Sequence, residues 1–85
     1  MFLILLKYRS LETIDALLEE HYGNPDGVFA QGLVRISGRM EPRTGGLMVV
    51  EGTRDEVARA VASDPFITSG AATAEVIEFV PTRLP

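Results

Sequence analysis

The chain has 85 residues, of which 46% are hydrophobic, and its eight basic and twelve acidic residues give a formal net charge of −4. This size predicts one domain over residues 1–85. The acidic balance, with no cluster of Lys or Arg, argues against nucleic acid or an anionic membrane as a partner. One histidine and no cysteine exclude a disulfide framework and the common zinc sites, leaving open only a carboxylate-rich magnesium or calcium site.

The N-terminal residues 2–6 form the apolar run Phe-Leu-Ile-Leu-Leu, which leads directly into Lys7, Tyr8 and Arg9. The run lacks a preceding basic region and is too short to span a bilayer, so it does not fit a signal peptide or a membrane span. We predict a buried strand over residues 2–8. A cytoplasmic protein is the expectation that follows.

A first helix is predicted after this strand, with Ser10 as its N-cap and Glu12 in its first turn. Apolar residues then recur at helical spacing: Leu11, Ile14, Leu17 and Leu18. His21 follows Leu17 by four residues, which places it on the apolar stripe in the last turn before Gly23.

The middle of the chain predicts a short helix and two strands. Asn24 and Pro25 have the pattern of a helix start, so we expect a short helical piece through residues 28–30 that ends at Gly32. Residues 33–40 alternate as a half-exposed strand, residues 41–46 form a turn, and residues 47–50 form an apolar strand.

Thr53 and Glu56 make a capping box at the start of a second long helix, which should close by Ser63 because Pro65 disfavours helical geometry at Asp64. After a turn at Gly70, residues 74–80 are the last predicted strand. The order βαββαβ predicts an α+β ferredoxin-like fold, a four-stranded antiparallel sheet with the first and third strands at its centre. These two strands are apolar on both faces and the helices cover one face, so we expect a homodimer formed through the other sheet face.

His21 and Asp64 are the main candidates for chemistry. His21 is the only side chain of its type, and its ordinary pKa suits proton transfer near neutral pH. Asp64 leaves the second long helix on the side that faces the sheet, so the two side chains could converge, with the carboxylate orienting the imidazole. The structural alternatives are a helix-terminal histidine favoured by the helix dipole and an aspartate that caps the turn begun by Pro65.

The segment 42–46, Pro-Arg-Thr-Gly-Gly, is a candidate anion site. Its glycines could let backbone amides approach an anion, and Arg43 could bind a carboxylate. A plain hairpin turn with a solvated arginine is the alternative. Ser37 and Arg35, on the polar face of their strand, could line the same cavity or simply be exposed at the sheet edge. Neither a P-loop nor a Gly-x-Gly-x-x-Gly fingerprint is present, and no cofactor is expected.

Motifs spread over nearly the whole chain resemble those of the YCII-related proteins. They are residues 1–8, the helix of His21, Ser37-Gly38, residues 42–46, Asp64-Pro65-Phe66 and Glu78-Phe79. The resemblance implies a dimeric α/β barrel of two ferredoxin-like sheets and an active site built on the pair His21 and Asp64. Gly23 and Pro25 depart from it by interrupting a usually continuous helix, and Arg39 stands where proline is common.

Proteins of similar fold include a lactone isomerase and a dehydrochlorinase, both cofactor-free proton-transfer enzymes. The resemblance therefore implies a lyase or isomerase for a small anionic or aromatic-derived substrate. His21 would be the general base or acid, Asp64 would orient it, and Arg43 and Ser37 would hold the substrate. The alternative is a non-catalytic small-molecule-binding or accessory subunit in which His21 and Asp64 only shape the pocket.

Overall fold

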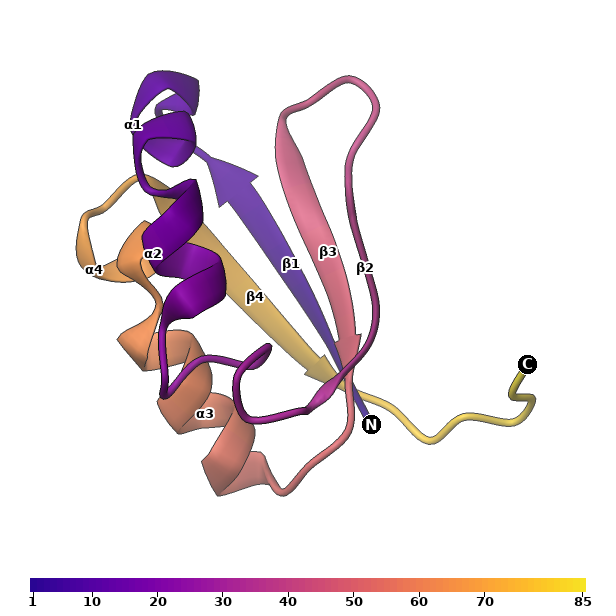
Figure 1. Cartoon of the computed structure of the whole chain (residues 1–85). Coiled ribbons are helices and arrows are strands. Elements are labelled where there is room, and N and C mark those ends of the chain that lie inside the picture. The colour runs from indigo at the N-terminus through magenta and orange to yellow at the C-terminus, as the bar shows by residue number, and fades with distance from the viewer.

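Four antiparallel strands in the order β2-β3-β1-β4 form a single sheet in the computed structural model, which describes all 85 residues (Figure 1). The strands and helices are β1 (Phe2–Tyr8), α1 (Leu11–Ala16), α2 (Leu18–Gly23), β2 (Val34–Arg39), β3 (Gly45–Val50), α3 (Arg54–Ser63), α4 (Pro65–Thr68) and β4 (Ala72–Glu78). The ferredoxin-like topology predicted from the sequence is confirmed, with β1 and β3 at the centre.

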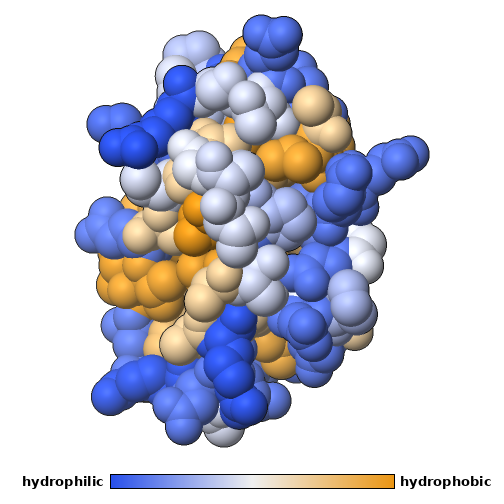
Figure 2. Space-filling model, turned by 90° about the vertical axis from the view of Figure 1, so that its left-hand side faces the viewer, coloured by the Kyte–Doolittle hydropathy of each residue, from blue (hydrophilic) through white to orange (hydrophobic).

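The helices all lie on one face of the sheet (Figure 1), and the hydrophobic core lies between the two layers. Alternation along the central strands supplies this core: Phe2, Ile4 and Leu6 point to the helices and are almost fully buried. Val57 and Phe66 close the core from the helical side. The outer surface of the helical layer is mainly polar, with smaller apolar patches (Figure 2).

The opposite face of the sheet has no cover. The intervening residues of the central strands, such as Leu3 and Val49, are half-buried on this face, and their neighbours Ile36 and Ile77 are 56% and 39% exposed. The predicted second apolar surface is therefore present, and the sheet pairing explains it. Strands with apolar residues on both faces can bury only one of them in a two-layer fold.

The first predicted helix is divided into α1 and α2 at Leu17, whose backbone φ of −105° and ψ of 6° leave the helical range. Ser10 caps α1 as predicted, since its hydroxyl accepts from the Thr13 N–H at 3.3 Å. Leu11 is 43% exposed and does not continue the buried stripe. No Pro or Gly lies at the break, and the local sequence gives no reason for it.

The short helix predicted through residues 28–30 is wrong. Residues 25–32 form successive turns, closed by hydrogen bonds such as Gly27 N–H to Asn24 and Gln31 N–H to Gly27. The hydrogen bonds of this segment span three, four or five residues and so do not repeat the helical spacing, and Gly32, with a φ of 71°, ends the turns in the left-handed region. Val28 anchors the segment in the core at 5% exposure.

The β2–β3 hairpin differs from the prediction at two points. A register shift between Val34 and Ile36 interrupts the alternation of β2, and β3 begins at Gly45 and not at residue 47. A β-carbon at Gly45 would lie 2.0 Å from the Leu6 carbonyl oxygen, so glycine is required there by the adjacent strand. Gly45 and Gly46 are thus buried strand residues, and the predicted cradle of backbone amides for an anion is absent.

The second half of the chain follows its capping signals. Thr53 and Glu56 form the predicted capping box of α3, which ends at Ser63 as expected. The sequence pattern did not predict α4, in which Pro65 occupies the first turn after the N-cap Asp64. Strand β4 covers residues 72–78 and not 74–80, so it begins and ends two residues earlier than predicted.

Candidate active site

Asp64 is held in place by its role as the N-cap of α4. Its backbone is extended, with φ −65° and ψ 125°, and its Oδ1 accepts a hydrogen bond from the Phe66 N–H at 2.9 Å. The residue is only 7% exposed. The sequence Asp64-Pro65 therefore fixes the carboxylate locally, because proline sets the first helical turn and aspartate caps it.

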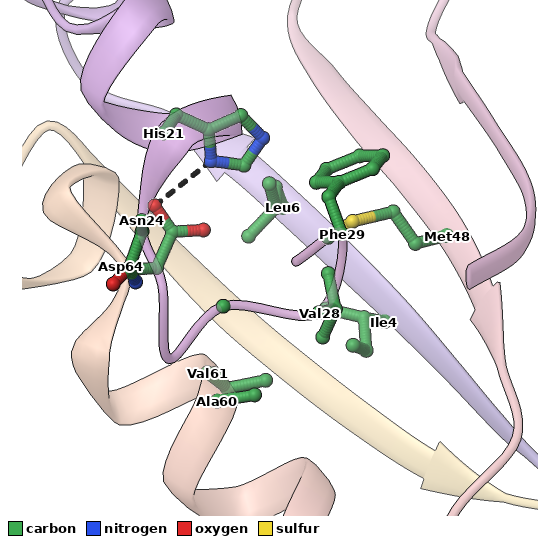
Figure 3. Close-up of a pocket in the computed structure, with 11 residues that line it drawn as sticks. Ile4, Leu6, His21, Asn24, Val28, Phe29, Met48, Ala60, Val61 and Asp64 are labelled. Carbon is green, nitrogen blue, oxygen red and sulfur yellow. Dashed lines mark hydrogen bonds and ion pairs between the residues drawn. The ribbon is translucent and has the colours of Figure 1, made fainter. Parts of the chain in front are cut away.

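His21 meets this carboxylate from the last turn of α2, also at 7% exposure. Its Nδ1 lies 2.9 Å from Asp64 Oδ1, the contact drawn in Figure 3. A carboxylate accepts, so Nδ1 carries a proton, and in the neutral ring Nε2 is then the basic nitrogen. The predicted convergence is present, and Asp64 both caps the helix and contacts the histidine.

Three aromatic rings surround the imidazole. The Phe66 ring stacks on it with centroids 3.9 Å apart and planes within 6°, while Tyr22 and Phe29 approach edge-on at 4.9 and 5.5 Å. Phe66 therefore acts twice, since its backbone N–H fixes Asp64 and its ring fixes the plane of His21. The stacked ring and the hydrogen bond to Asp64 together hold the imidazole in this orientation.

Asn24 ties together the two segments that carry the pair. Its side-chain amide donates to the Ser63 carbonyl at 3.1 Å and to the Ser63 hydroxyl at 2.8 Å, while its Oδ1 accepts from the Asp26 N–H. Asn24 is three residues after His21, and Ser63 directly precedes Asp64. The cap predicted at Asn24 thus serves a turn and a tertiary contact.

Beside His21 lies an open cavity of about 330 Å³ between the helices and the β2–β3 hairpin. The only hydrogen bond of the imidazole is at Nδ1, and no buried side-chain nitrogen or oxygen lacks a partner, so Nε2 is accessible from outside. In Figure 3 this nitrogen points away from Asp64. The residues of the cavity wall are Leu6, Tyr8, Leu18, His21, Tyr22, Phe29, Ser37, Gly38, Arg39, Arg43, Gly46, Leu47, Met48 and Phe66.

A second, enclosed space of about 10 Å³ lies below the pair, between α3 and the sheet (Figure 3). Its wall is mainly apolar and includes Ile4, Val28 and Val61. This volume suits about one water molecule. Of the two spaces that His21 lines, only the larger has room for a substrate, and Asp64 is not part of its wall.

The structure brings Ser37 and Arg43 to the wall of the larger cavity. The register shift in β2 sets Ser37 opposite Met48, a residue of the helix-facing side of the sheet. Arg43 Nη2 lies 2.6 Å from Asp15 Oδ1, which links the hairpin to α1. Arg35 does not reach the cavity, because it pairs with Glu51 at 2.8 Å at the other end of the hairpin.

Tyr8 and Arg39 were not among the predicted site residues, although both line the cavity. Burial raises the pKa of the Tyr8 phenol, and the nearby charge of Arg43 lowers it in part. The tyrosine therefore stays protonated near neutral pH and has a hydroxyl to donate. Position in a strand gives no sign of this role, because it depends on which helices cover that end of the sheet.

No group of three or more histidine, aspartate or glutamate side chains is placed to hold a metal ion. None of the helices has the length and apolar character needed to cross a membrane. The chemistry that the described residues can supply is thus acid–base chemistry by the imidazole, hydrogen bonding by hydroxyls and charge from the arginines.

Fold and site together define a ferredoxin-like α+β domain with a buried histidine–aspartate pair beside an open cavity. Residues 1–80 match the YCII-related domain, and the chain belongs to this family. The fold is similar to that of 5-chloro-2-hydroxyhydroquinone dehydrochlorinase from Burkholderia phenoliruptrix in complex with 2,5-dihydroxybenzoquinone. The TM-score is 0.73 at 18% identity, with 94% of each chain covered. No curated protein matches the chain.

Proposed function

We propose that this protein is a cofactor-free lyase or isomerase that moves a proton on a small anionic or aromatic-derived substrate. The observation that supports this most is the His21–Asp64 contact of 2.9 Å together with the access of Nε2 to a cavity. A buried carboxylate behind a histidine and an open space before it are the arrangement that general base catalysis needs.

In this proposal the neutral Nε2 of His21 takes a proton from the substrate. The electron pair released forms a new double bond and either expels a leaving group such as halide or takes back the proton at another carbon. The first outcome is a dehydrohalogenation and the second an isomerisation, such as that of a lactone. Asp64 stabilises the imidazolium that forms and holds Nδ1 protonated, so that Nε2 stays the reacting nitrogen.

Ser37 and Arg43 are the proposed substrate-binding residues, because both line the same cavity as His21. The guanidinium suits a carboxylate or an ionised hydroxyl, and the serine hydroxyl can donate or accept a hydrogen bond. The dehydrochlorinase of similar fold acts on a hydroxylated chloroaromatic compound. Halogenated hydroxyquinols and unsaturated lactones are therefore the first compounds to test.

The test is a pH–rate profile for these compounds with the wild type, His21→Ala and Asp64→Asn, and with Arg59→Gln as a surface control. We expect turnover to fall by about 100-fold or more without the imidazole, since general base catalysis contributes about 10²–10⁴-fold. Turnover that survives His21→Ala would remove the histidine from the mechanism. Binding of these compounds without turnover in any variant would instead favour a small-molecule-binding subunit.

We also propose that the uncovered sheet face forms a homodimer, the partner being a second copy of the chain. This face is apolar, and a dimer would remove it from water. It holds the half-buried Leu3 and Leu5 and the exposed Ile36 and Ile77. Light scattering should give twice the monomer mass of 9.3 kDa. Leu5→Glu should give the monomer, and a monomeric wild type would refute the proposal.

A further inference from the structure

The charge of the larger cavity is opposite to that of the chain. Acidic residues outnumber basic ones twelve to eight, yet the cavity wall holds Arg39, Arg43 and no aspartate or glutamate. A site lined by one sign of charge with apolar walls concentrates a ligand of the opposite sign. The cavity wall thus favours an anion more than the net charge of the chain does.

The same wall also holds most of the aromatic residues of the chain. Four of the six aromatic residues of the chain line this cavity: Tyr8, Tyr22, Phe29 and Phe66. Phe66 is already stacked on the imidazole, while Tyr22 and Phe29 lie near each other with ring centroids 4.8 Å apart. Aromatic side chains at such spacing favour offset or edge contacts with a further planar ring.

The two arginines differ in how closely they are paired with a carboxylate. Arg43 lies 2.6 Å from the Asp15 carboxylate and its side chain is 30% exposed. Arg39 has only a 3.5 Å contact between its Nε and Glu41, with both side chains more than two-thirds exposed. An exposed pair at that distance contributes little, so the guanidinium of Arg39 is free to bind a ligand.

The sheet register directs Arg39 to the cavity. Arg39 pairs with Gly46 across β2 and β3, two positions beyond Ser37, so both point to the helical face. Gly46 has no side chain, and a β-carbon there would lie 3.3 Å from the Tyr8 hydroxyl. The space beside Arg39 is therefore bounded by the Tyr8 hydroxyl, which can donate a hydrogen bond to an anion.

We infer that the cavity takes a planar aromatic ligand with a carboxylate-like anionic group, and that Arg39 is a further binding residue that sets the preference for the anion. The inference rests on the proposed function for placing the ligand beside His21. Arg43 and Ser37 remain contacts on the same wall, and the free guanidinium of Arg39 supplies the two parallel N–H groups that a carboxylate accepts.

The single histidine makes a direct test feasible, because its Hε1 proton gives one imidazole signal in the ¹H NMR spectrum. Titration of the full chain with benzoate should shift this signal in a saturable way. Benzamide, which has the same shape without the charge, should bind with an affinity at least about tenfold lower. Equal binding of the two probes, or no saturable shift with benzoate, would overturn the inference.

The variant Arg39→Gln should weaken benzoate binding by about tenfold or more, Arg39→Lys should give an intermediate affinity, and Arg59→Gln on α3 should match the wild type. Arg39 is exposed, so thermal unfolding should show all variants folded. Wild-type affinity in Arg39→Gln would overturn the inference. Benzoate binding that depends on Arg39 in a protein without turnover would keep the inference and remove only the proposed reaction.

Discussion

Replacing Asp64 tests whether one carboxylate holds both a helix start and the histidine. Its Oδ1 lies 2.9 Å from His21 Nδ1 and 2.9 Å from the Phe66 backbone nitrogen, in a residue that is 7% exposed. Asp64→Ala removes both acceptor contacts and leaves two donors unpaired in a buried site. Asp64→Asn keeps an oxygen acceptor of the same size at the same place and removes only the charge.

The expected cost follows from these two contacts. Loss of a buried hydrogen bond to a charged group costs about 1.5–3 kcal/mol, and loss of an N-cap costs about 0.5–2 kcal/mol. Asp64→Ala should therefore lower the free energy of unfolding by roughly 2–5 kcal/mol, out of the roughly 4–13 kcal/mol typical of a domain this long. Asp64→Asn should cost about 1 kcal/mol, because asparagine caps helices as well as aspartate does.

Urea unfolding followed by circular dichroism measures the difference, with the exposed Asp26→Ala as a matched control. A loss of about 3 kcal/mol corresponds to a fall in Tm of roughly 12–24 °C for a domain of this size. The order of stability should be wild type, then Asn, then Ala. If Asn and Ala destabilise equally, or if Ala behaves like the control, the double role of the carboxylate is refuted.

In a Tyr22→Phe background Tyr8 is the only phenol, and its absorbance titration should have a midpoint above 10.0, the ordinary pKa of a tyrosine, because burial disfavours the phenolate. Because the pKa of Tyr8 is raised in the folded state, the protonated phenol contributes stability that is present below pH 10 and is lost as pH rises through the folded pKa. Arg43→Gln should raise the midpoint further, because the charge of Arg43 lowers this pKa. A midpoint equal to that of the chain unfolded in urea would contradict the assignment. Asn24→Ala removes hydrogen bonds of 2.8 and 3.1 Å to Ser63 and should lower the free energy of unfolding by about 1–3 kcal/mol, more than Ser63→Ala does. Gly45→Ala should destabilise the chain far more than Gly38→Ala in urea titrations, since a β-carbon meets the Leu6 carbonyl at 2.0 Å in the first case and open space in the second. Equal unfolding midpoints for the two glycine variants would show that β3 can shift away from β1.

Most of the fold could be predicted from local patterns. The apolar runs of β1 and β3 and the capping signals at Ser10 and Thr53 lie where the structure has the corresponding elements. The errors occur where local signals are weak or serve a tertiary contact. Residues 25–32 have a helix-start pattern but form turns whose hydrogen bonds do not repeat the helical spacing. The glycines of β3 resemble a turn, although the Leu6 carbonyl requires glycine at position 45 within the strand.

The candidate site was predictable only where local patterns determine the direction of a side chain. His21 and Asp64 could be predicted because each lies at the inward-facing end of a helix, where periodicity determines direction. Strand alternation alone suggested Arg35 as a cavity residue, but the register shift between Val34 and Ile36 interrupts this alternation, so Arg35 and Ser37 need not share a face. Tyr8 and Arg39 could not be assigned, because nothing local indicates which end of the sheet the helices leave open.

The sequence by itself determined the order of the four strands and the places of the two main helical segments, the central position of β1 and β3 and the inward direction of His21, since these depend on the spacing of residues along one element. Only the tertiary structure decided that the Asp64 carboxylate serves both α4 and the imidazole, and that arginines and aromatic rings line one cavity. Those features depend on distances between elements far apart in the chain. Such distances are set by packing against the sheet, and no local pattern records them.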